Sequence, residues 1–155
     1  AAGLVAGSSQ AAGIDIHAGA EAADIGLPVY PGAVKRPEDD GSRDDFSFGL
    51  WGSSFGVKIA TVAYRSRDEV DDVSAFYRDA LHRFGPVVDC SAGVPRAHAQ
   101  PASGARTLDC GDDDADPGVR LYKSGSPDDQ HVVEIKPLAR GASFRLTRVQ
   151  TRGLD

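Results

Sequence analysis

An acidic segment of the chain carries carboxylates at alternate positions: Asp112, Asp114 and Asp116. Calcium-binding loops use this spacing because it directs hard oxygen ligands toward one ion. An EF-hand loop counted from Asp112 needs glycine at its sixth position and glutamate at its twelfth, whereas this sequence has Pro117 and Lys123 there. The sequence therefore favours an acidic hairpin loop, and a looser, calcium-stabilising site is the alternative.

The four histidines are scattered along the chain, at His17, His82, His98 and His131. None of them forms the i, i+4 pair or the Cys-x-x-Cys grouping that is typical of zinc sites, so no cofactor is expected. His131 alternates with Val133 and Ile135, which places it on the inward side of a strand. A buried histidine satisfied by a backbone carbonyl is expected, with a binding or acid-base role as the alternative.

No motif for nucleophilic catalysis or phosphate binding is recognisable. The segment Gly52–Gly56 resembles Gly-x-Ser-x-Gly, but a strand follows it where a nucleophile elbow requires a helix. Glycine-rich phosphate loops are also absent from the sequence. The sequence therefore favours a protein that is not an enzyme.

Three aromatic residues, Trp51, Tyr30 and Tyr64, are candidates for a contact with a partner. Trp51 stands beside Gly52, at the tip of an expected hairpin, where an exposed indole anchors partners in many interfaces. A tryptophan at a turn more often folds back over the edge of the core. Trp51, His131 and Tyr30 are the candidate binding residues.

The two cysteines, Cys90 and Cys110, each follow a short apolar run that ends in aspartate. The segment between them is rich in Pro, Gly, Ala and Ser, so it reads as a loop joining two strands. We expect a disulfide between them, which stabilises the fold by roughly 3 kcal/mol in the chain-entropy model. Such a bond implies an oxidising compartment; two buried thiols in a reducing one are the alternative.

The segment 67–84 has the pattern of one amphipathic helix. Ser66 and Glu69 have the spacing of a capping box, and Gly85 with Pro86 marks the end. The apolar residues recur every three or four positions and form one stripe: Val70, Val73, Tyr77, Leu81 and Phe84. A helix of this kind needs an apolar sheet face to cover its stripe.

Short alternating segments before and after the helix predict that sheet. They are centred on residues 13–17, 46–50, 55–59, 86–90, 106–110, 119–121, 131–135 and 144–146. We predict an α+β fold, with a single mainly antiparallel sheet of five to seven strands and the helix on one face. Residues 1–12 form an N-terminal segment, 13–150 the domain and 151–155 a C-terminal tail.

Composition limits the classes of function. The 155 residues carry a formal charge of -6, which argues against a nucleic-acid partner because phosphate backbones are bound by clustered Lys and Arg. No apolar run reaches the roughly 20 residues of a transmembrane helix. The start, AAGLVAGSSQAAG, is similar to the end of a secretory signal, although Ser8 stands where a lipoprotein would have its lipid-bearing cysteine.

Three segments carry a family resemblance: LPVYPGA at Leu27–Ala33, FYRDALHRFG at Phe76–Gly85 and QHVVEI at Gln130–Ile135. Together with the two cysteines they resemble a family of small, uncharacterised bacterial exported proteins, some of them lipoproteins. The resemblance implies export to the periplasm or the cell exterior and assigns no catalytic residue.

The expected function is that of a non-enzymatic module of the bacterial envelope or of the secreted proteins, which binds a protein or cell-surface ligand. One alternative is a small ligand-binding protein or hydrolase with a pocket between the Trp51 hairpin and the His131 strand. The other is a module stabilised by calcium at Asp112, Asp114 and Asp116.

Overall fold

The computed structural model describes residues 12–36, 45–95, 108–113 and 115–153. In chain order the elements are β1 (Ala12–Ala18), α1 (Ala22–Ile25), β2 (Val34–Lys35), β3 (Phe46–Gly52), β4 (Gly56–Ser66), α2 (Val70–Leu81), the 3₁₀ turn η1 (His82–Phe84), β5 (Val88–Asp89), β6 (Arg120–Ser126), β7 (Asp129–Pro137) and β8 (Ala142–Arg152). No helix in these described ranges is long and apolar enough to span a membrane.

All the strands belong to one antiparallel sheet with the order β1-β3-β4-β8-β7-β6-β5, and β2 pairs with the far end of β4. The α+β prediction is confirmed, but the described part of the sheet has eight strands, where five to seven were predicted. The prediction missed β2 because Val34 and Lys35 follow a Pro-Gly turn and precede a charged run. They become a strand only by pairing with Arg65 and Tyr64.

Two boundaries also differ from the prediction. Thr151 and Arg152, assigned to the tail, pair with β4 and belong to β8. The expected strand at 106–110 is not formed where the structure describes it, since residues 108–110 have no regular secondary structure and precede a turn. Residues 106–107 and most of the expected N-terminal segment lie outside the described residues.

Helix α2 buries the stripe that the sequence predicted. Val73, Tyr77 and Leu81 are each 0% exposed, and the helix packs on β6 and β7. Its predicted start was wrong: Glu69 is the N-cap, without a side-chain cap, and the Ser66 hydroxyl accepts the Asp68 N–H at 3.1 Å. Ser66 is still the last residue of β4, so it cannot cap a helix that begins four residues later.

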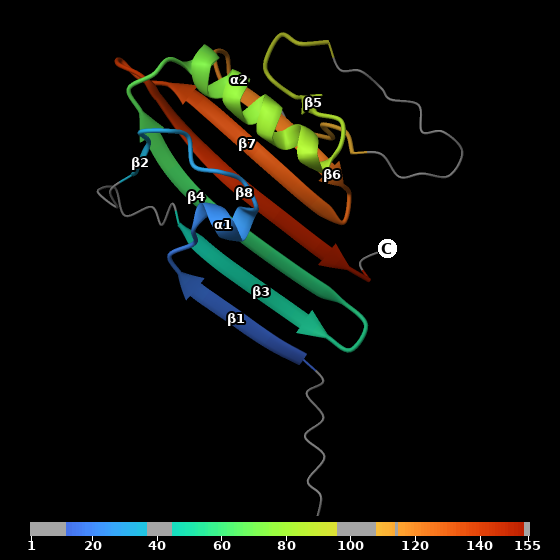
Figure 1. Ribbon diagram of the computed structural model, residues 1–155. Helices are drawn as coiled ribbons and strands as arrows, with labels where there is room; N and C mark the ends of the chain where they lie inside the picture. The colour runs from blue at the N-terminus through green and yellow to red at the C-terminus, as the bar shows by residue number, and fades with distance from the viewer. Residues whose placement is uncertain (1–11, 37–44, 96–107, 114, 154–155) are drawn as a thin grey trace, which may run out of the picture.

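Both helices lie on the same face of the sheet, which we call the near face (Figure 1). The short helix α1, which the sequence analysis missed, contacts β4 and β8 and ends at Gly26, where the backbone has a φ of 80°. The main core lies between this helical layer and the sheet, and its largest buried side chains include Tyr77, Tyr122 and Phe144.

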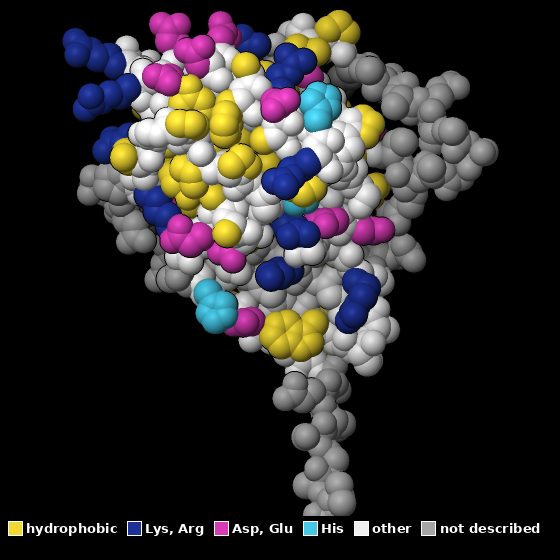
Figure 2. Space-filling view, viewed as in Figure 1, with side chains coloured by type: hydrophobic (Ala, Val, Ile, Leu, Met, Phe, Trp, Pro, Cys, Tyr) yellow, Lys and Arg dark blue, Asp and Glu magenta, His cyan; other side chains and the backbone are white. Residues whose placement is uncertain are grey.

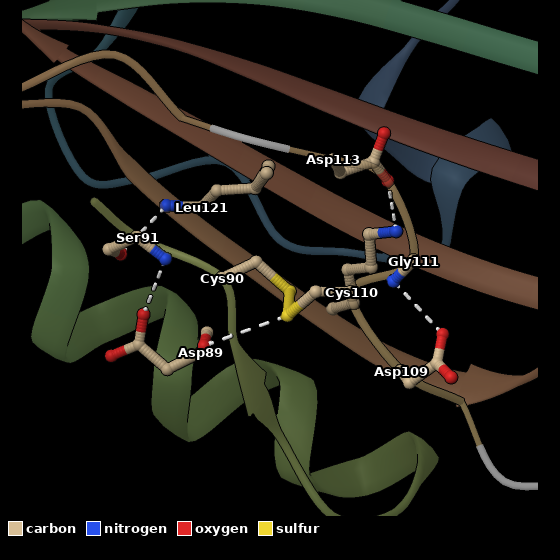
Figure 3. Close-up of a disulfide and its surroundings, with 9 residues drawn as sticks. Asp89, Cys90, Ser91, Asp109, Cys110, Gly111, Asp113 and Leu121 are labelled. Carbon is tan, nitrogen blue, oxygen red and sulfur yellow. Dashed lines mark hydrogen bonds and ion pairs between the residues drawn. A yellow bond between two sulfur atoms is a disulfide. The ribbon is translucent and has the colours of Figure 1, made fainter. Parts of the chain in front are cut away.

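On the opposite face, the predicted disulfide joins Cys90 to Cys110 across a Cα separation of 5.6 Å. Both cysteines are buried against Leu121 of β6. The Cys90 N–H donates to the Leu121 carbonyl at 2.7 Å. The Leu121 N–H donates to the Ser91 hydroxyl at 3.0 Å (Figure 3). The bond therefore ties the chain on both sides of a long connection to the edge of the sheet.

Candidate ligand-binding site

Beyond α1, strands β1, β3, β4 and β8 extend past the helical layer (Figure 1). The near face is hollowed there. This hollow, which we call the trough, has a volume of about 760 Å³. Its lining side chains include Asp15, His17, Asp24, Trp51, Lys58, Asp128, Gln150 and Arg152. Acidic, basic, histidine and hydrophobic side chains lie next to one another over this end of the sheet (Figure 2).

Strand register places Trp51 in this trough. Trp51 of β3 pairs with Gly13 of β1 on one side and with Gly56 of β4 on the other. Gly56 in turn pairs with Arg152 of β8. Residues at alternate positions share a face, and Val62 and Tyr64 of β4 lie in the near-face core, so this whole row faces the trough.

The next row follows the same rule. Asp15 pairs with Gly49, Gly49 with Lys58, and Lys58 with Gln150. The floor between the carboxylate and the ammonium is therefore a glycine without a side chain. The two rows together place Trp51 and Asp15 toward one side of the trough and cationic side chains toward the other, with glycines between them.

The Trp51 indole rests directly on glycine. A Cβ added at Gly13 would lie 2.4 Å from the indole Cζ2, and one added at Gly49 would lie 3.5 Å from Cζ3. Trp51 is nevertheless 40% exposed, so it does not fold back into the core as tryptophans at turns more often do. The ring is supported on one side by the sheet and is accessible from the trough.

Some charged side chains of the trough have partners within the protein, and others do not. Asp15 pairs with His17 at 2.7 Å, Asp24 accepts the Glu21 N–H at 2.8 Å, and Asp128 is not free either. By contrast, the side chains of Lys58 and Arg152 have no ion-pair or hydrogen-bond partner among the residues that the structure describes. The trough therefore presents two basic side chains that are open to a ligand, while its three carboxylates keep their charges but already make contacts within the protein.

A serine also lines the trough, in a setting that invites comparison with a catalytic triad. Ser47 pairs across the strands with His17, which is bound to Asp15. In a triad the serine hydroxyl hydrogen-bonds to the histidine, and no such bond joins Ser47 to His17 in the described structure. His17 and Asp15 are also exposed, so the arrangement is that of a polar rim.

His131 does not line the trough. Its side chain is 2% exposed, stacks on Phe84 with ring centroids 3.6 Å apart, and its Nδ1 lies 2.9 Å from the Ile25 carbonyl oxygen. Burial lowers the pKa of His131, although the nearby Asp129 acts in the opposite direction. These contacts match the expected buried histidine and give His131 the role of joining α1, η1 and β7.

His131 should make the fold sensitive to mild acid. The pKa of His131 is lower in the folded protein than in the unfolded chain, so the unfolded chain binds a proton at His131 at a higher pH. The contribution of His131 to the free energy of unfolding is therefore present above about pH 6.5 and is lost as the pH falls below that value. We expect the urea midpoint of the wild type to fall between pH 7.5 and pH 5, and that of His131→Gln to fall less. The exposed His82 provides the control, and a His82→Gln variant that flattened the profile equally would contradict this role.

Tyr30 and Tyr64 are part of the core and not of the trough. The Tyr30 hydroxyl donates to Asp68 at 2.6 Å, a bond that raises the pKa of Tyr30 to about 12, and its N–H donates to the Tyr77 hydroxyl at 3.0 Å. Tyr64 stacks on Phe144. Of the three candidate binding residues, only Trp51 lines the trough.

The acidic segment lies elsewhere, near the disulfide. Asp112 and Asp116 are exposed, and Asp113 forms an ion pair with the buried Lys123. Asp114 lies outside the described residues. Among the residues that are described, no group of three or more His, Cys, Asp or Glu side chains is arranged to hold a metal ion.

The sequence alone does not identify Lys58, Gln150 and Arg152 as residues of the trough. Alternation assigns each of them to one face of a strand, but only the register β3-β4-β8 brings them beside Trp51. Comparison of the chain with protein-family models, with curated proteins and with solved structures finds no match.

Proposed function

We propose that this chain is a non-enzymatic, exported binding module that holds a ligand of the bacterial envelope in the trough. The observation that carries the proposal is the exposed Trp51 ring on its glycine support, beside Lys58 and Arg152 without partners. Ligand sites are hollows of roughly 300–1,000 Å³, and the volume of the trough lies in this range. Its lining is mostly polar, and Trp51 supplies an aromatic surface among the hydrogen-bonding groups.

Two features support the other parts of the proposal. The disulfide is of the kind that persists in oxidising compartments, which favours export. The Asp15–His17 pair is exposed and is not joined to Ser47, which favours binding over hydrolysis.

Trp51 provides both the test and its readout, because it is the one tryptophan of the chain. An envelope preparation should change the fluorescence of the wild type saturably and retain the protein on sedimentation. Trp51→Ala should weaken retention about tenfold, since stacking on one aromatic ring is worth roughly 1–3 kcal/mol. Val34→Ala removes an exposed apolar side chain on β2, which does not line the trough, and should bind like the wild type.

Two neighbouring residues of β1 test whether the position of the indole matters. Ala at Gly13 would force the ring to move, whereas Ile14 is exposed on the opposite face of the sheet and does not line the trough. Gly13→Ala should therefore weaken retention and Ile14→Ala should not. Equal retention of the wild type, Trp51→Ala and Gly13→Ala would overturn the proposal.

A further inference from the structure

We infer that the trough binds a saccharide that carries a carboxylate on an otherwise uncharged ring. This inference rests on the proposed function and adds the chemical class of the ligand. It is carried by three features of the trough: a supported aromatic face, two cations without partners, and carboxylates already engaged within the protein.

The aromatic face selects a flat, weakly polar surface. The indole of Trp51 has one side against Gly13 and Gly49, so only its other side and its edge meet a ligand. The C–H face of a sugar ring packs on the electron-rich face of an aromatic ring, and its hydroxyls remain at the rim for hydrogen bonds. The rigid support means that little conformational entropy is lost when this contact forms.

The cations select a negative group at a defined place. Arg152 lies two strands from Trp51 in the same row, which corresponds to a separation of about 10 Å at the backbone. Lys58 and Gln150 are direct cross-strand partners in the next row. A carboxylate on a sugar stacked over Trp51 would therefore meet an ammonium, a guanidinium and an amide, all of which donate hydrogen bonds.

The remaining groups exclude a polyanion. Asp15, Asp24 and Asp128 line the same trough, and the whole chain has a net charge of -6. A nucleic acid or a polyphosphate would bring several charges against these carboxylates. Sugar hydroxyls, in contrast, donate hydrogen bonds to carboxylates, so the acidic side of the trough suits the uncharged part of the ligand.

Titration of Trp51 fluorescence with an aldotriouronic acid, a trisaccharide that carries one carboxylate on otherwise neutral sugars, and with its carboxyl-reduced, neutral counterpart tests the inference on the full chain. We expect the acidic trisaccharide to bind at least tenfold more tightly than the neutral one at low ionic strength. The preference should decrease with added salt, because exposed charges are screened. The double variant Lys58→Ala/Arg152→Ala should bind both trisaccharides with the weaker, neutral affinity. Lys136→Ala, on the opposite face of the sheet, should keep the preference of the wild type.

The outcomes separate this inference from the proposed function. Equal binding of the two trisaccharides would overturn the carboxylate part of the inference and leave the binding module intact. No binding of either, while envelope retention still depends on Trp51, would overturn the saccharide assignment as a whole and also leave the binding module intact. Loss of both trisaccharide binding and Trp51-dependent retention would overturn both. A preference for the acidic form that survives the double variant would contradict the role of Lys58 and Arg152.

Discussion

Phe144→Ala should lower the free energy of unfolding by about 3–5 kcal/mol. Phe144 is 1% exposed and lies at the centre of an aromatic cluster, with ring centroids 5.7 Å from Tyr64, 5.2 Å from Tyr77 and 6.4 Å from Tyr30. Truncation removes these contacts and leaves a cavity between the sheet and α2, which close-packed surroundings fill only in part. Urea unfolding followed by far-UV circular dichroism measures the effect.

Two further variants keep this test informative. Phe144→Leu retains most of the volume and should cost less than about 1.5 kcal/mol, so it reports on the site even where the alanine variant fails to fold. Leu138→Ala changes a side chain that is 44% exposed and should stay within about 0.5 kcal/mol of the wild type. Equal stabilities of Phe144→Ala and Leu138→Ala would show that the aromatic cluster does not support the core.

Loss of the disulfide should have the second largest effect, about 3 kcal/mol. Cys90 and Cys110 are 20 residues apart, and cross-linking a loop of that length removes chain entropy from the unfolded state by about this amount. The double variant Cys90→Ala/Cys110→Ala should show a lowered urea midpoint. The loss is expected around β5 and β6, because the bond ties that edge of the sheet.

Reductant gives the matched control for this prediction. The wild type should become as unstable as the double variant when it is reduced, and the double variant should not respond to reductant at all. A wild type whose urea midpoint is unchanged by complete reduction would mean that the hydrogen bonds of Cys90 and Ser91 to β6 hold the edge without the covalent link.

Local patterns were sufficient for the parts of the fold that depend on neighbours in sequence. The stripe of α2 was predictable because residues three and four apart share one face of a helix. The disulfide was predictable because two similar sequence settings contained the two cysteines. The capping box at Ser66 and Glu69 failed because β4 competes for Ser66, which pairs with Ala142. Because Ala142 lies 76 positions from Ser66 in the sequence, no local pattern predicts this pairing.

The trough also combines features that the sequence predicts with features that only the tertiary structure decides. The sequence by itself determined that Trp51 stands at the end of a strand beside glycine and that Lys58 and Arg152 occupy alternating positions of theirs. Only the tertiary structure decided that these side chains meet. Gly13, Trp51, Gly56 and Arg152 come from four strands, and their positions side by side depend on the antiparallel register. A slip of one residue would turn every side chain of a strand to the other face, and for β4 and β8 the burial of Val62, Tyr64, Phe144 and Leu146 in the core opposes such a slip.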